Sequence, residues 1–128
     1  MPGETAADIG SYAAQSAALL VAHIIKVKLG TEHLSLPEAK KVYEDEKIDV
    51  STQAARVADV MKSSFDGRRI VVFSGGSKKG IDGVYDDARA IRDGGGNGSI
   101  IGRNTFQRER GEAMDMLAKL VEIYKGKA

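Results

Sequence analysis

Two lysines interrupt the otherwise apolar segment 22–29, whose β-branched residues predict a β-strand. Lys26 and Lys28 are two residues apart, so both side chains should project from the same face of that strand. Burial and a neighbouring like charge both favour a neutral amine, which is the form that attacks a carbonyl to make a Schiff base. The spacing alone favours a simpler interpretation, in which the strand frays and both ammonium groups extend to water.

Two glycine-containing segments at the ends of predicted strands could bind an anion: Ser74-Gly75-Gly76 and Gly102-Arg103-Asn104. Glycine lets backbone N–H groups approach a phosphate, and the hydroxyl of Ser74 could donate a further hydrogen bond. The guanidinium of Arg103 could bind a phosphate through two of its N–H groups. Each segment alone is also typical of a turn. Two such loops at the carboxyl ends of consecutive parallel strands, however, match the phosphate site of eight-stranded α/β barrels.

The elements that must position these residues can be predicted from the spacing of apolar side chains. Short apolar segments predict strands at 22–29, 70–73 and 99–101. Helical spacing predicts helices at 6–20, from Ser51 to the turn at Asp66-Gly67, at 82–92 and at 110–124. The segment 31–50 has little periodicity, and it is either a long excursion or a loop with a short helix that begins at Pro37.

Each predicted helix should bury one stripe of side chains. In the first helix the stripe is Ile9, Tyr12, Ala13, Ser16, Leu19 and Leu20. In the second it is Ala54, Val57, Ala58 and Met61. In the third it is Val84, Ala88 and Ile91, and the run Gly94-Gly95-Gly96 should end this helix. In the last it is Met114, Leu117, Leu120 and Val121.

Strands that alternate with amphipathic helices predict a parallel sheet with right-handed crossovers, so the predicted fold class is α/β. The continuously apolar strand 70–73 indicates that helices cover both faces of the sheet. No linker or low-complexity tract divides the sequence, and we expect residues 1–128 to form a single domain. That length is about half of the roughly 250 residues that an eight-stranded α/β barrel needs.

Composition excludes several classes of function. With no cysteine and two histidines, the chain lacks the residues for a disulfide framework, a thiol nucleophile or a Cys/His zinc site, and we expect no metal or cofactor. Lys and Arg number 19 against 18 Asp and Glu, so no strong field would recruit nucleic acid or an anionic membrane. The longest apolar run, 17–22, is far shorter than the roughly 18 residues of a membrane span. These features favour a cytoplasmic protein with a small-molecule partner.

Three segments together resemble a known family. HIIKVK at 23–28, RIVVFSGG at 69–76 and DGGGNGSIIGRNTFQR at 93–108 are similar to the C-terminal part of class I fructose-bisphosphate aldolases of the bacterial and archaeal, DhnA-like type. The resemblance covers essentially the whole chain. It implies a (β/α)8 TIM barrel, of which residues 1–128 would be the last three strand–helix units, an incomplete barrel preceded by one helix.

The resemblance also implies a reaction and a role for each candidate residue. Lys26 would form a Schiff base with fructose 1,6-bisphosphate, which is cleaved reversibly to dihydroxyacetone phosphate and glyceraldehyde 3-phosphate in glycolysis and gluconeogenesis. Lys28 would support it by helping to keep the amine of Lys26 neutral. The substrate phosphate would bind Ser74, Gly75, Gly76, Gly102 and Arg103. The implied chemistry needs no cofactor, and the implied partners are a phosphorylated sugar and further copies of the chain in a homo-oligomer.

In that family the general acid/base tyrosine and an active-site aspartate come from earlier strands, and neither Tyr12 nor Tyr43 occupies the matching position. The chain by itself is therefore expected to be a poor aldolase. Two alternatives stay open. One is a non-catalytic phosphate-binding fragment that pairs with a second copy or a missing half to cover its strand edges. The other is a related Schiff-base aldolase that acts on a different substrate.

Overall fold

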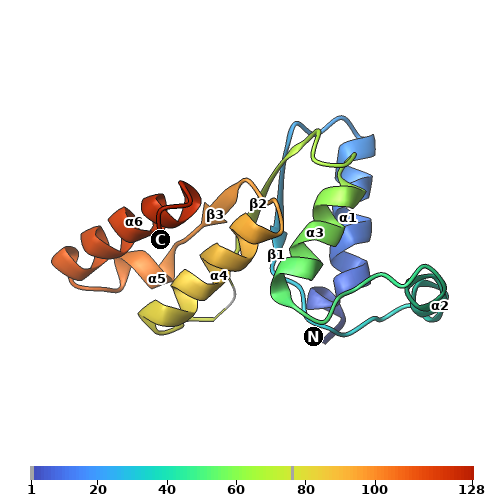
Figure 1. The fold of residues 1–128 in the computed structure, drawn as a ribbon, viewed down its shortest axis with the longest axis horizontal. Helices are drawn as coiled ribbons and strands as arrows, with labels where there is room; N and C mark the ends of the chain where they lie inside the picture. The colour runs from blue at the N-terminus through green and yellow to red at the C-terminus, as the bar shows by residue number, and fades with distance from the viewer. Residues whose placement is uncertain (1, 76) are drawn as a thin grey trace.

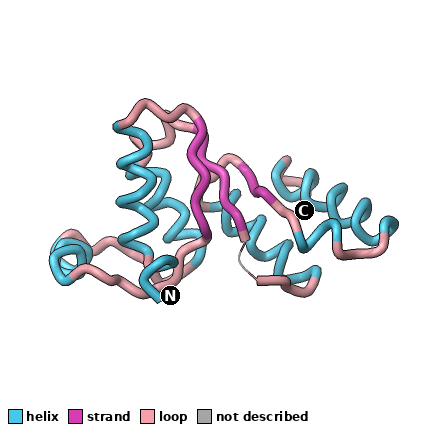
Figure 2. The backbone as a smooth tube through the Cα atoms, turned by 180° about the vertical axis from the view of Figure 1, so that it is seen from behind, coloured by secondary structure: helices cyan, strands magenta, loops and turns pink. Residues whose placement is uncertain are grey.

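The centre of the molecule is a sheet of three parallel strands. A computed structural model, which describes residues 2–75 and 77–128, places β1 (Ile24–Lys28), β2 (Ile70–Ser74) and β3 (Gly98–Ile100) in the order β1-β2-β3 (Figures 1 and 2). In this register Lys26 pairs with Val72 and Lys28 with Ser74. All three strands run in the same direction, so their carboxyl ends meet along one edge of the sheet. The predicted α/β class with parallel strand–helix repeats is confirmed.

The helices follow the predicted order, with two short additions. A 3-10 helix, Pro2–Thr5, precedes α1 (Ala7–Leu19), α2 (Pro37–Asp45), α3 (Gln53–Ser63), α4 (Ile81–Asp93), α5 (Arg103–Phe106) and α6 (Arg110–Tyr124). The segment 31–50 takes the second of its two predicted forms, a loop with a short helix from Pro37, whose fixed φ suits the first helical turn. Helix α5, directly after β3, was not predicted. No helix in residues 2–75 and 77–128 is long and apolar enough to cross a membrane.

Helices cover one face of the sheet, which corrects the prediction that both faces are covered. Helices α1, α3, α4 and α6 form a row in which each contacts the next (Figure 1). Ile25, Val71 and Phe73 project toward this row and are buried in the main hydrophobic core. Side chains alternate along a strand, so the intervening residues project from the other face. There Ile24 is 65% exposed and Ile70 49% exposed, although their apolar character suggested burial.

The buried helical stripes were predicted correctly only in part. In α4 the predicted Val84, Ala88 and Ile91 are all buried. The predicted stripe of α1 is wrong, because Tyr12, Leu19 and Leu20 are exposed. In α6 the predicted Leu120 is buried, but the predicted Met114, Leu117 and Val121 are exposed. Helix α1 instead buries Ala7, Asp8, Ser11, Ala14 and Ala18, and α6 buries Met116, Leu120 and Ile123. Small side chains let α1 lie close to α3 and β1, and the larger apolar residues project away from that contact.

The glycine run after α4 ends the helix as predicted and also allows a close approach. Gly94 is the C-cap of α4, and Gly95 has a positive φ of 84°. A Cβ atom at Gly94 would lie 2.5 Å from the carbonyl oxygen of Ala54 and 2.6 Å from the side chain of Val57. The absence of a side chain at Gly94 therefore lets the end of α4 pack directly on α3.

Candidate functional site

The candidate residues gather at the carboxyl edge of the sheet. A cavity of about 290 Å³ lies there, at the low end of the volume range typical of ligand pockets. Its lining includes Lys26, Ser74, Gly75, Gly102 and Arg103. The remaining predicted phosphate-binding residue, Gly76, lies outside the described residues. A lysine and two glycine-containing loops from three successive strands thus share one cavity.

The side chain of Lys26 projects from the face of the sheet that the helices do not cover, and it is exposed. The described residues offer it no hydrogen-bond or ion-pair partner, so its amine can approach a ligand in the cavity. Alternation along β1 places Lys28 on the same face, as predicted from the spacing. Both lysines are solvated, and neither is buried by the three-stranded sheet.

Lys28 has a partner of its own. Its Nζ donates to Oε1 of Glu4 at 2.5 Å, and both side chains are at least half exposed. This hydrogen bond and the charge of Lys28 lower the pKa of the Glu4 carboxyl. Lys28 lines a second cavity of about 220 Å³, beside α1. The role expected of Lys28, to help keep the amine of Lys26 neutral, stays a prediction, and any such effect would act beside the ion pair of Lys28 with Glu4.

Ser74 is the last residue of β2, and the loop toward α4 follows it. The backbone carbonyl of Ser74 accepts a hydrogen bond from the N–H of Leu29 at 3.3 Å. Its hydroxyl donates to the carbonyl of Val27 at 3.5 Å, a distance at the limit for a hydrogen bond. A bond this long can be exchanged for one to a ligand by rotation of the hydroxyl. Gly75, the next residue, is exposed and lines the cavity.

The loop after β3 continues directly into α5. Gly102 is the N-cap residue of this helix, and its carbonyl accepts hydrogen bonds from the N–H groups of Thr105 and Phe106. Arg103 is the first residue of α5, is exposed and lines the cavity. Arg103 therefore lines the same cavity as Ser74 and Gly75 of the other loop.

Two polar side chains join these loops: Asn104, named above only as the last residue of Gly102-Arg103-Asn104, and Arg108, which was not among the candidate residues. Asn104 Oδ1 accepts a hydrogen bond from the backbone N–H of Lys79 at 2.9 Å, and Arg108 Nη2 donates to the carbonyl of Lys79 at 2.9 Å. Both residues belong to the segment 93–108, one of the three that carry the resemblance. The spacing of residues along the sequence does not predict these two hydrogen bonds, because each joins a side chain to a backbone group 25 or 29 residues away.

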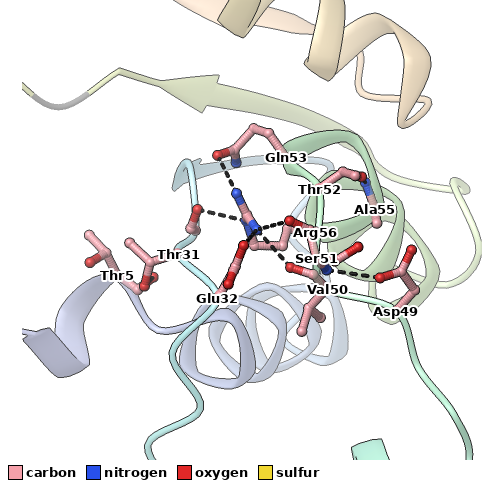
Figure 3. Close-up of polar contacts among 11 residues, drawn as sticks. Thr5, Thr31, Glu32, Asp49, Val50, Ser51, Thr52, Gln53, Ala55 and Arg56 are labelled. Carbon is pink, nitrogen blue, oxygen red and sulfur yellow. Dashed lines mark hydrogen bonds and ion pairs between the residues drawn. The ribbon is translucent and has the colours of Figure 1, made fainter.

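The segment after β1 is held in place by Arg56. This side chain lies at the centre of Figure 3, where its guanidinium donates to the carbonyl of Val50 at 2.6 Å and to Oε1 of Gln53 at 3.1 Å. It also donates to the carbonyl of Gly30 at 3.1 Å. Arg56 is 12% exposed, so these bonds are largely shielded from water. One side chain thus fixes both ends of the segment between β1 and α3.

Tyr43 and Tyr124, whose pKa values are raised, do not line the cavity that contains Lys26. Burial and a hydrogen bond to Asp59 raise the pKa of Tyr43 well above its usual range, and burial raises that of Tyr124. Tyr12 is exposed on α1, and neither it nor Tyr43 lines either cavity. No group of three or more His, Asp or Glu side chains in residues 2–75 and 77–128 is placed to hold a metal ion.

Comparison with known proteins adds an identification to this geometry. The sequence profile described as "DeoC/LacD family aldolase" matches residues 3–108. The chain belongs to the DeoC/LacD aldolase family. This confirms the resemblance to aldolases inferred from the three sequence segments. No curated protein sequence matches this aldolase-family chain.

Two solved structures are similar to this family member. An archaeal fructose 1,6-bisphosphate aldolase is 26% identical, with a TM-score of 0.71 over 97% of this chain and 40% of that one. A Schiff base-forming fructose-1,6-bisphosphate aldolase is 25% identical, with a TM-score of 0.70 over 95% of this chain and 39% of that one. The chain therefore spans about 40% of the length of these aldolases and has the fold of part of an aldolase barrel.

Proposed function

We propose that this chain carries the Schiff-base lysine and the phosphate-binding loops of a class I aldolase whose substrate is fructose 1,6-bisphosphate. The observation that carries the proposal is the shared cavity, which is lined by Lys26, by Ser74 and Gly75, and by Gly102 and Arg103. A nucleophilic amine beside a phosphate site fits a phosphorylated ketose. The similarity to a Schiff base-forming fructose-1,6-bisphosphate aldolase supports the same substrate.

The reaction would begin with Nζ of Lys26, which attacks the C2 carbonyl of the open-chain ketose. Loss of water then leaves an iminium ion. When a base removes the proton of the C4 hydroxyl, the C3–C4 bond breaks and its electron pair moves into the iminium. Glyceraldehyde 3-phosphate leaves, and an enamine remains. Protonation at C3 and hydrolysis release dihydroxyacetone phosphate and free Lys26.

The phosphate loops would contribute orientation. A phosphate held by backbone N–H groups of the loop after Ser74 and by the guanidinium of Arg103 would fix one end of the substrate. The carbonyl would then lie beside Lys26, and attack would become effectively intramolecular. Arg103 also supplies the positive charge that the phosphate requires at this end of the sheet.

We also propose that residues 1–128 act as one domain that corresponds to the last three strand–helix units of a barrel. The open face of the sheet and the 40% coverage of the similar aldolases support this proposal. Tyr12 and Tyr43 lie outside the cavity, so proton transfer would depend on groups other than these two tyrosines. General acid/base catalysis contributes about 10² to 10⁴ in rate, so turnover by this chain should be slow even where the Schiff base forms.

Trapping of the Schiff base tests the proposal. The protein is incubated with dihydroxyacetone phosphate and borohydride, and the modified residue is identified by mass spectrometry. We expect one adduct, on Lys26, which is absent in Lys26→Met and retained in the control Lys62→Met, an exposed lysine on α3. An equal adduct in Lys26→Met, or no adduct in the native chain, would exclude the Schiff-base role. Cleavage assays with other phosphorylated ketoses then decide whether fructose 1,6-bisphosphate is preferred.

A further inference from the structure

The loop between β2 and α4 is bound to the loop after β3 through one residue, Lys79. Its backbone N–H donates to Oδ1 of Asn104 at 2.9 Å, and its carbonyl accepts from Nη2 of Arg108 at 2.9 Å. Both polar backbone groups of Lys79 are thus satisfied by side chains of the other loop. The side chain of Lys79 forms an ion pair with Asp87 of α4 at 2.6 Å.

Arg108 is fixed on every side by its own contacts. Besides Lys79, its guanidinium donates from Nε to the carbonyl of Asn104 at 2.7 Å and from Nη1 to Oε1 of Glu112 at 2.7 Å. The side chain is only 10% exposed. All three guanidinium nitrogens are therefore engaged by protein groups, so Arg108 is built to hold the backbone and not to bind a ligand.

We infer that Arg108 and Asn104 are positioning residues that set the separation of the two phosphate-binding loops. This inference rests on the proposed function, because it concerns how the same phosphate site is assembled. The sheet does not provide this constraint, since β3 pairs with β2 through three residues only and the pairing ends at Ser74 and Ile100. Beyond that point, the contacts at Lys79 fix one loop against the other before any ligand arrives.

The inference predicts a selective defect in phosphate recognition. Adduct formation on Lys26 is measured with dihydroxyacetone phosphate and with dihydroxyacetone, which lacks the phosphate. In the native chain the phosphorylated ketone should be preferred. Arg108→Gln should reduce that preference about tenfold or more and leave the adduct with dihydroxyacetone unchanged, because only the phosphate site is displaced. Asn104→Ala should have the same selective effect.

Two controls separate positioning from general damage to the fold. Arg110→Gln removes the same charge at the exposed start of α6 and should keep the native preference. Hydrogen exchange in the ligand-free protein should be faster at the amide of Lys79 in Asn104→Ala and in Arg108→Gln, and unchanged in Arg110→Gln. Native exchange at Lys79 in both loop variants would overturn the inference.

The adduct measurements give clear alternatives. If Arg108→Gln reduces both adducts equally, the residue has only a structural role and the inference is wrong; an unchanged preference also overturns it. If the native chain forms no adduct with either ketone, the proposed function fails. Binding of inorganic phosphate, followed by NMR in native protein, Arg108→Gln and Arg110→Gln, then decides the positioning role on its own: selective weakening in Arg108→Gln supports it, and equal affinities overturn it.

Discussion

Replacement of Gly94 by alanine tests the packing that places α4 beside the site. A Cβ atom at this position would lie 2.5 Å from the carbonyl oxygen of Ala54 and 2.6 Å from Cβ and Cγ1 of Val57. The carbonyl oxygen of Ala54 and Cβ of Val57 are fixed by the backbone of α3, so neither can move away unless the helix shifts. The φ of −80° and ψ of −1° at Gly94 are accessible to alanine, so the cost would arise from the contact and not from backbone strain.

The size of the effect follows from the geometry. An overpacked contact of this kind typically destabilises a protein by about 1–3 kcal/mol. Gly10, within α1, is the matched control, because a Cβ atom there would meet nothing within 4 Å. Alanine is favoured over glycine inside a helix by about 1 kcal/mol, so Gly10→Ala should stabilise. The same chemical change should therefore have opposite signs at the two positions, with free energies of unfolding about 2–4 kcal/mol apart.

Urea denaturation followed by circular dichroism measures this difference. With a dependence on urea of about 1–3 kcal/mol per molar, the midpoints of the two variants should differ by about 0.7 to 4 M. Gly94→Ala should unfold at lower urea than the native chain, and Gly10→Ala at higher urea. A midpoint for Gly94→Ala at or above the native value would show that α3 and α4 are not in the close contact described above.

Two further predictions concern the segment between β1 and α3. Arg56→Gln should lower the free energy of unfolding by about 1–3 kcal/mol, because the hydrogen bonds to the carbonyl groups of Gly30 and Val50, at the two ends of this segment, are lost. Proteolysis within 31–50 should also become faster. Cleavage no faster than in the control Arg68→Gln would contradict this prediction. Burial and the hydrogen bond to Asp59 raise the pKa of Tyr43 in the folded protein. As the pH rises, the Tyr43 hydroxyl therefore ionises in the unfolded chain before it ionises in the folded one, so the free energy of unfolding should fall above about pH 10. In urea titrations, the free energy of unfolding of Tyr43→Phe should fall less over this pH range than that of the native chain. An equal fall in Tyr43→Phe and in the control Tyr12→Phe would show that Tyr43 is not the group responsible.

The sequence was sufficient to predict the order of the elements, because each strand is short and apolar and lies between segments with helical spacing. It also predicted the buried face of α4, whose apolar and charged residues alternate clearly around the helix. It failed for α1, where small residues such as Ala14 and Ala18 make the contact and Leu19 and Leu20 do not. A prediction from periodicity chooses as the buried face of a helix the one with the largest apolar side chains. Where two helices approach closely, however, the buried face carries small side chains.

The candidate site was predictable in its residues but not in its contacts. Lys26, Ser74 and Arg103 could be placed at one edge because parallel strands bring their carboxyl ends together, and these three line one cavity. The bonds of Asn104 and Arg108 to Lys79 depend on the conformations of two loops relative to each other, which no local pattern encodes. The pairing of Lys28 with Glu4 likewise depends on where the first turn of the chain lies against β1.

The open face of the sheet links the burial of apolar residues to the chemistry of Lys26. Ile24, Lys26 and Ile70 all project from this face and are exposed. A Schiff-base lysine, the role proposed for Lys26, is activated by desolvation or by a nearby cation, and Lys28 on the same face is paired with Glu4. Any surface that covers the two isoleucines would also remove water from around Lys26. Burial of this face would therefore stabilise the sheet and favour the neutral, nucleophilic amine in the same step.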